Sequence, residues 1–238
     1  MIDLVPLHVQ PDEFVRRAQA APDDVVLCRF SRPLTQAEVQ EYVSQLSSVP
    51  VAPEEVDVRA ITHTPSVTDS TALSLDRLAL HTDGAFLAEP PPRFVLSCTR
   101  TDDGGEGAST FVPVDFIVDS APGWAVESLE RASFRFLKTY DGDLTDSYVG
   151  PVLTTDHDGA RRIRWRADHL YRPEVVDARG TRAAEAVAWL HELLETCDPF
   201  RYVLQAGELV VIPNRRVVHG RTALSDASHR ELLRAWIF

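Results

Sequence analysis

The stretch LALHTDGAF, residues 78–86, begins like a short β-strand and ends in a turn. In a strand, residues two apart share a face, so Ala79, His81 and Asp83 would point the same way. An imidazole and a carboxylate on an inner face need a partner or a metal ion, because burying an unpaired charge is costly. Gly84 supplies the bend that would leave the pair at the open end of a β-sandwich or barrel. Alone, a His-x-Asp pair is weak evidence, and a surface or hydrogen-bonded pair at a strand end is its commoner explanation.

A second stretch, AGELVVIPNRRVVHGRTAL at residues 206–224, carries another histidine. Two strands flank a turn at residues 206–208, and a second turn at residues 214–215 leads to His219 in a third strand. A lone histidine there is usually a core residue. Together with His81 and Asp83, however, it completes two imidazoles and one carboxylate, a ligand set that leaves positions open for an organic acid and dioxygen on iron(II).

Two arginines follow His219 in HRELLRAWIF, residues 229–238. A co-substrate such as 2-oxoglutarate chelates iron through its keto and C1-carboxylate oxygens, and its far carboxylate needs a fixed bidentate cation. Arg230 lies eleven residues after His219 and could supply it, and Arg234 lies four residues further on. The two arginines share a face in either a strand or a helix. The alternative is an amphipathic C-terminal helix with two solvated arginines.

Short strand signals dominate the chain from residue 78 onward. They are LALHTD, RFVLSCTR, STFVPVDFI, RFLKTY, RIRWRA, RYVLQ, ELVVI and RVVHGRTA, with one clear helix at TRAAEAVAWLHELLETC. This pattern predicts a mainly β protein with flanking helices (α+β) and a sandwich or barrel-like core. Residues 1–49 are expected to form a helix-strand-helix support, with Thr35 and Glu38 as a capping box. Residues 50–76, rich in Pro, Ser, Thr and Asp, are expected to form a long active-site lid loop.

Length and composition narrow the class of protein. A chain of 238 residues suits a single domain spanning residues 1–238, with residues 77–238 as its core. A net charge of −12 argues against a nucleic-acid partner. No apolar run is long enough for a membrane and no export signal is evident, so we expect a cytoplasmic protein. The 3 cysteines are widely spaced, which indicates neither a disulfide framework nor a structural zinc site.

These stretches together resemble the taurine dioxygenase and clavaminate synthase-like family of Fe(II)/2-oxoglutarate-dependent oxygenases. The resemblance rests on LALHTDGAF with the following PPPRFVLSC, on DDGGEGASTF, on AGELVVIPNRRVVHGRTAL and on HRELLRAW, in that order. It implies a double-stranded β-helix (jelly-roll) core. It also implies that His81, Asp83 and His219 hold iron, that Arg230 pairs with the C5 carboxylate of 2-oxoglutarate, and that Arg234 supports the site or touches substrate.

Further residues follow from the same resemblance. The family's Gly-Gly-x-Ser/Thr element appears as GGEGAST, with two extra residues, and places a hydroxyl on 2-oxoglutarate. We assign that role to Thr110, with Ser109 as the alternative; a plain strand-edge hydroxyl would explain either. Asn214 corresponds to a polar residue that orients the turn before the distal histidine, although a simple turn asparagine fits equally well. In RIRWRADHLYRP, Trp165 and Asp168 fall where some amino-acid hydroxylases of the family bind substrate; a surface strand of alternating charge is the plainer explanation.

The implied activity is hydroxylation of an unactivated C–H bond of a small molecule, an amino acid or a natural-product intermediate. Iron(II), 2-oxoglutarate and dioxygen act together, releasing succinate and carbon dioxide; desaturation or cyclisation is open to the same ligand set. Two other hypotheses are a non-catalytic β-barrel that binds a small carboxylate, and a zinc hydrolase that uses the same His/Asp/His site. A hydrolase would not need Arg230. Neither the identity of the substrate, free or carrier-bound, nor the oligomeric state follows from the sequence.

Overall fold

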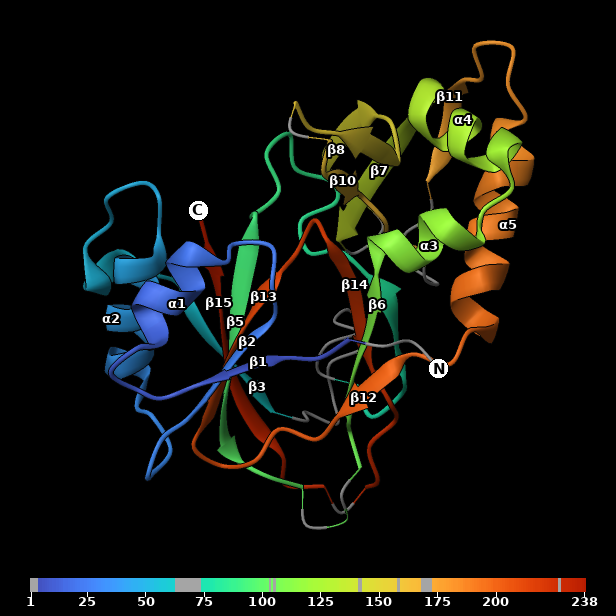
Figure 1. Ribbon diagram of the computed structural model, residues 1–238. Coiled ribbons are helices and arrows are strands. Elements are labelled where there is room, and N and C mark those ends of the chain that lie inside the picture. Colours follow the sequence, from blue (N-terminus) through green and yellow to red (C-terminus); the bar gives the residue numbers. More distant parts are fainter. Residues whose placement is uncertain are drawn as a thin grey trace.

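The stretch ELVVIP forms β13 (Glu208–Pro213), a strand that is buried along its whole length. It lies inside a six-stranded sheet in the order β1-β2-β13-β5-β15-β3 (Figure 1). Its other strands are β1 (Leu7–Val9), β2 (Val26–Arg29), β5 (Arg93–Arg100), β15 (Glu231–Ile237) and β3 (Val58–Thr62). The computed structural model describes residues 4–62, 74–102, 104, 106–140, 143–157, 159–167, 173–226 and 228–238. The stretch HRELLRAWIF, for which the sequence allowed either a strand or a helix, forms strand β15.

A second sheet has the order β12-β6-β14-β4 and carries the two histidines. Its strands are β12 (Phe200–Tyr202), β6 (Ser109–Pro113), β14 (Val217–Arg221) and β4 (Leu78–His81). Alternate residues of the two sheets form one buried apolar cluster. The first sheet contributes Phe94, Ile212 and Leu232, and the second contributes Phe111 and Val217. Because strand side chains alternate between faces, this cluster is the layer between the sheets.

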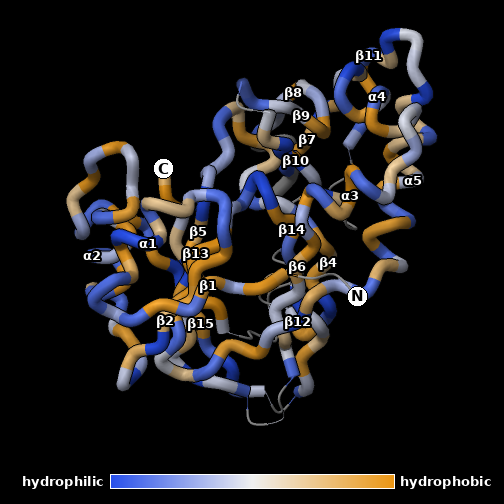
Figure 2. Tube along the Cα trace, in the orientation of Figure 1, coloured by the Kyte–Doolittle hydropathy of each residue, from blue (hydrophilic) through white to orange (hydrophobic). Residues whose placement is uncertain are grey.

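The opposite face of the six-stranded sheet is covered by α1 (Phe14–Ala20) and α2 (Gln36–Leu46), as Figure 1 shows. The predicted helix-strand-helix opening is thus present as α1, β2 and α2. The capping box is confirmed, since Thr35 Oγ1 accepts from Glu38 N at 3.3 Å and Glu38 Oε2 accepts from Thr35 N at 2.8 Å. Figure 2 shows hydrophobic positions (orange) among hydrophilic ones (blue) in this region, and the buried apolar residues of the two helices and of the sheet form one cluster, so the support is held by apolar packing.

The far face of the four-stranded sheet packs against the remaining helices and small sheets. The helices are α3 (Val114–Ser120), α4 (Gly123–Arg131) and α5 (Ala183–Thr196). The strands are β7 (Ser133–Tyr140), β8 (Asp143–Gly150) and β11 (Glu174–Asp177) in one sheet, and β9 (Leu153–Thr155) and β10 (Arg161–Ile163) in another. The predicted helix at residues 181–197 is confirmed as α5.

Two expectations need correction. STFVPVDFI was expected to be one strand, but β6 ends at Pro113 and α3 begins at Val114, with Val114 and Ile117 buried one helical turn apart. Proline lacks an N–H to continue the ladder and suits a helix start. Residues 50–76 were expected to be one loop, but η1 (Pro53–Glu55) and β3 lie within them, and β3 pairs with β15. Residues 63–73 of that stretch lie outside the described residues, and the lid role stays a prediction.

The described residues are mostly β, with five α-helices, in agreement with the α+β class. Across the same residues, no helix combines the length and apolar character that crossing a membrane requires.

Candidate metal centre

His81, Asp83 and His219 come together at the inner face of the four-stranded sheet. His219 on β14 is directly opposite His81 on β4 in the strand register. The Nε2 atoms of His81 and His219 lie 3.6 Å and 3.7 Å from the same oxygen, Asp83 Oδ1. All three side chains are buried, and one ligand atom from each lies within 4.8 Å of the others. The predicted triad is therefore assembled around one point.

The protonation of these groups suits a divalent metal ion. His81 Nδ1 is 2.8 Å from the carbonyl oxygen of Ala79, so Nδ1 carries the proton and Nε2 keeps a free lone pair. Burial and the neighbouring His81 lower the pKa of His219 to about 4, which leaves its imidazole uncharged at neutral pH. Two imidazoles and one carboxylate are the donors that fit iron(II), and the carbonyl of Ala79 orients the His81 ring through its second nitrogen.

Asp83 is also contacted by two side chains of β15, which keep it a carboxylate. Arg234 Nη1 lies 3.3 Å from Asp83 Oδ1, and Trp236 Nε1 donates to Asp83 Oδ2 at 2.9 Å. Burial acts to raise the pKa of Asp83, but Arg234 and the two imidazoles together keep that pKa well below its ordinary value. Arg234 thus contacts a residue of the predicted triad, and its role, supporting the site or touching substrate, stays a prediction. Trp236 was not predicted; alternation along β15 puts it on the face of Arg234.

The turn after Asp83 depends on Gly84 and Asn214. Gly84 has φ +64°, and a Cβ there would lie 2.9 Å from Pro91 Cδ. Asn214 is fully buried; its Oδ1 accepts from Asp83 N at 2.7 Å, and its Nδ2 donates to the carbonyls of Asp83 at 3.0 Å and Pro91 at 2.8 Å. The asparagine therefore fixes the backbone of a metal ligand from both sides.

We expect Asn214→Ala to lower the free energy of unfolding by about 2–4 kcal/mol, because it leaves buried backbone groups of Asp83 and Pro91 unpaired. Iron affinity should fall roughly 10- to 100-fold, as for the loss of other groups that orient a ligand. Chemical denaturation and iron titration measure the two effects. Asn214→Asp is the comparison: it keeps the acceptor for Asp83 N but replaces the donor to the two carbonyls with a buried carboxyl oxygen, so it should destabilise the protein as well. Unchanged iron affinity in the alanine variant would contradict an orienting role.

Arg230 lies in a cavity beside the triad, which we call the inner cavity. Among the residues lining it are His81, His219, Arg230, Arg234, Arg221 and Ser109. Burial, and then the neighbouring Arg221, lowers the pKa of Arg230 to about 10, so its guanidinium stays charged at neutral pH. Gly107, with φ +67°, lies close to this side chain, since a Cβ there would be 2.3 Å from Leu224 Cδ2 and 3.2 Å from Arg230 Cδ. A buried cation near the metal centre is suited to the far carboxylate of a bound dicarboxylate.

The strand register distinguishes the two candidate hydroxyls. On β6, Ser109 pairs with Arg221 and Phe111 pairs with His219, whereas Thr110 pairs with Gly220. Directly opposed residues share a face, so Ser109 is on the face of His219 and Thr110 is on the other. Ser109 lines the inner cavity. The geometry favours the Ser109 alternative over Thr110, and the contact with 2-oxoglutarate stays a prediction.

The two weakest site candidates have different outcomes. Trp165 is buried in the apolar cluster beneath the four-stranded sheet, and its backbone pairs with Thr82 between the metal ligands: Thr82 N donates to Trp165 O at 2.7 Å, and Trp165 N donates to Thr82 Oγ1 at 3.0 Å. This gives Trp165 a packing role, and contact with substrate stays a prediction. Asp168 lies outside the described residues.

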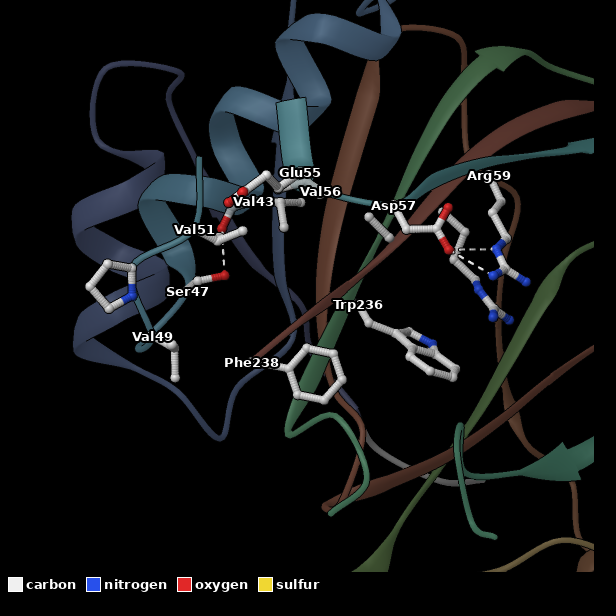
Figure 3. Close-up of a pocket in the computed structure, with 13 residues that line it drawn as sticks. Val43, Ser47, Val49, Val51, Glu55, Val56, Asp57, Arg59, Trp236 and Phe238 are labelled. Carbon is white, nitrogen blue, oxygen red and sulfur yellow. Dashed lines mark hydrogen bonds and ion pairs between the residues drawn. The ribbon is translucent and has the colours of Figure 1, made fainter. Parts of the chain in front are cut away.

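A larger cavity of about 340 Å³, the outer cavity, is drawn in Figure 3, and its lining includes Arg234 and Trp236, which both contact Asp83. Arg234 lines both this cavity and the inner one. In Figure 3, Trp236 and Phe238 form an aromatic wall, and Asp57 is paired with Arg59, whose Nη2 lies 2.7 Å from Asp57 Oδ2. The outer cavity therefore offers both signs of charge and an apolar surface next to the group that contacts Asp83.

A mostly β fold with a buried centre of two histidines and one carboxylate defines a non-haem metalloenzyme of the oxygenase type. The profile of the taurine catabolism dioxygenase TauD, TfdA family matches residues 17–236, so the chain belongs to that family. No curated protein sequence matches it.

Three solved structures illustrate the likeness. An asparagine oxygenase in complex with Fe(II), 2S,3S-3-hydroxyasparagine and succinate has a TM-score of 0.73 and 22% identity, covering 96% of this chain and 80% of that one. The non-heme iron oxygenase OrfP in complex with Fe and alpha-ketoglutaric acid has a TM-score of 0.69 and 18% identity, covering 94% of this chain and 78% of that one. The PvcB protein from Pseudomonas aeruginosa has a TM-score of 0.69 and 18% identity, covering 98% of this chain and 85% of that one.

The protein is accordingly a 2-oxoglutarate-dependent non-haem iron dioxygenase, and its cofactors are Fe(II) and the co-substrate 2-oxoglutarate. The family assignment and the assembled His-Asp-His centre favour neither the zinc hydrolase nor the non-catalytic barrel.

Proposed function

We propose that this dioxygenase hydroxylates a small amino acid or an amino-acid derivative bound in the outer cavity. The observation that carries the proposal is Arg234, which lines the outer cavity, lines the inner cavity and contacts the metal ligand Asp83. A substrate carboxylate at this guanidinium would lie next to the metal centre. A charge-assisted bond of this kind is strong and directional, so it would fix which C–H bond is nearest the iron.

The rest of the outer cavity suits a zwitterion. Glu55 and Asp57 can accept from an ammonium group, while Trp236 and Phe238 offer an apolar wall to a side chain. Support of a second kind comes from the solved structures, which hold 3-hydroxyasparagine in one case and (3R,4R)-dihydroxy-L-Arg in another. The outer cavity is also too small for a macromolecular substrate, at about 340 Å³.

Each residue of the site then has a distinct task. His81, Asp83 and His219 would hold the iron, which with 2-oxoglutarate and dioxygen supplies the oxidant for an unactivated C–H bond. Arg230 would hold the co-substrate by its far carboxylate. Arg234 and Trp236 keep the Asp83 carboxylate ionised and oriented, and the burial of the triad excludes bulk water. We further propose that the two packed sheets form a double-stranded β-helix and that the chain is one domain.

The experiment is a screen of amino acids, amino-acid amides and carrier-bound amino acids, with sulfonates as the comparison class. The purified protein is supplied with iron(II), ascorbate and 2-oxoglutarate, and succinate and product mass are measured. We expect at least one amino acid to raise succinate formation above the substrate-free background and to gain one atom of oxygen-18 from labelled dioxygen. A product two hydrogens lighter, without added oxygen, would indicate desaturation or cyclisation instead. Turnover confined to sulfonates would contradict the proposed substrate class.

A further inference from the structure

A second buried arginine lies beside Arg230 in the inner cavity. Arg221 follows the metal ligand His219 by two residues on β14 and is only 5% exposed. Ser109 is directly opposite Arg221 in the register of β6 and β14. Side chains two apart on a strand, and those opposed across a ladder, share a face. Ser109, His219 and Arg221 therefore project into the same space as Arg230, and all four line the inner cavity.

The guanidinium of Arg221 has unused hydrogen-bonding capacity. Its Nη2 donates to the carbonyls of Ser74 at 2.6 Å and Asp76 at 2.7 Å, in the segment that leads into β4. Its Nε is buried, and within the described part of the chain it has no hydrogen-bond partner. A buried donor without a partner is costly, and such groups are commonly completed by a ligand.

The charges in the inner cavity are also unbalanced. Among the described residues, no ion pair joins Arg221 or Arg230 to a carboxylate. The nearby Asp76 favours the charged form of Arg221 without pairing with it. Asp102 likewise favours the charged form of Arg230, but its Oδ2 accepts from Glu106 N at 2.9 Å. Two like charges held together away from water repel each other, and an anion placed between them relieves the repulsion.

We propose that Arg221 is a second cationic binding residue for the far carboxylate of 2-oxoglutarate, acting together with Arg230 and with the hydroxyl of Ser109. The inference rests on the dependence of this enzyme on 2-oxoglutarate and adds how the dicarboxylate is selected. Because Arg221 also holds the carbonyls of Ser74 and Asp76, one guanidinium joins the co-substrate to the segment preceding the metal strand. The inner cavity then discriminates against 2-oxo acids that lack a second carboxylate.

The test compares two co-substrates of equal chain length. Calorimetry under argon on the iron(II)-loaded protein measures the dissociation constants for 2-oxoglutarate and for 2-oxopentanoate, which carries a methyl group in place of the far carboxylate. Arg221→Gln is expected to weaken 2-oxoglutarate binding about tenfold or more, and to leave 2-oxopentanoate binding within about twofold, because only the former has the charge that Arg221 contacts. A purely structural role, exerted through Ser74 and Asp76, would weaken both acids alike and would overturn the proposal, as would no change in either.

Arg215→Gln is the matched control. Arg215 Nη2 likewise donates to a backbone carbonyl, that of Pro90 at 2.7 Å, and its Nε is likewise buried without a partner among the described residues, but it does not line the inner cavity. The Arg215→Gln variant should prefer 2-oxoglutarate over 2-oxopentanoate to the same degree as the unmodified protein. Should Arg221→Gln not retain iron, Arg221→Lys replaces it, with a smaller but still selective loss expected. An unmodified enzyme that shows no preference for 2-oxoglutarate would refute the co-substrate assignment itself.

Discussion

Substitution of His219 by alanine is expected to abolish iron binding and turnover while leaving the fold largely intact. Within the described part of the chain the site has three protein donors, and the Nε2 atoms of both histidines approach one oxygen of Asp83. Loss of an outer group that merely orients a ligand already weakens metal binding by roughly 10- to 100-fold, so loss of a ligand should exceed that. His81→Ala and Asp83→Ala should likewise abolish iron binding and turnover. Metal analysis after reconstitution and succinate formation measure it.

The fold should survive because His219 is uncharged in the metal-free protein. Its pKa of about 4 lies below the ordinary value, so at neutral pH the alanine variant loses an imidazole but leaves no buried charge unpaired. Asp83→Ala is the harsher change, since it removes the partner of Arg234 and the acceptor of Trp236. The control is His191→Ala, at an exposed position of α5. A normal iron content in His219→Ala would rule out the triad.

The depressed pKa of His219 also fixes the direction of the pH dependence. A histidine whose pKa is lower in the folded than in the unfolded protein binds a proton more readily after unfolding, so stability falls as the pH falls from about 6.5 toward 4. Above about pH 6.5 the group contributes no such loss. Iron binding also needs the unprotonated form, but the folded protein keeps His219 unprotonated down to about pH 4, so protonation of His219 should weaken iron binding only as the pH approaches that value.

That His81, Asp83 and His219 come together could be predicted from the sequence, because local rules place each of them and the resemblance joins them into one site. Strand alternation and a turn glycine bring His81 and Asp83 to one mouth, and His219 stands in a strand whose pattern is unambiguous. Arg230 follows from the need for a fixed cation and from its distance along the chain. The capping box at Thr35 and the helix at α5 are likewise local features, and both are present.

What could not be predicted depends on register and on long-range pairing. Whether Ser109 or Thr110 faces the metal centre depends on which of them is opposite Arg221, and a slip of one residue reverses the answer. Trp236 could be placed beside Asp83 only once β15 was known to be a strand rather than a helix. Helix α3 was missed because its valines and isoleucine favour a strand locally, whereas Pro113 and packing against β10 determine a helix.

Arg230→Lys is expected to raise the 2-oxoglutarate requirement strongly. Arg230 is 8% exposed and stays charged despite burial, which lowers its pKa only to about 10. A lysine ammonium cannot form the planar two-bond contact with a carboxylate, and the loss of a charge-assisted bond amounts to about 1.5–3 kcal/mol, or roughly a 10- to 150-fold weaker affinity. The same burial beside Arg221 would also lower the pKa of a lysine, from a lower starting value, and so reduce its charged fraction.

Arg234→Lys separates the two arginines. Arg234 contacts Asp83 and lines the outer cavity, so its replacement should alter iron retention and the KM for the primary substrate more than the KM for the co-substrate. Steady-state kinetics with each substrate varied in turn distinguish the two patterns. If Arg234→Lys alone raised the 2-oxoglutarate requirement, the roles of the two arginines would have to be exchanged. Arg230 lines the inner cavity, whereas Arg234 lines both cavities. If both lysine variants raised the 2-oxoglutarate requirement equally, a single ligand would have to occupy both cavities.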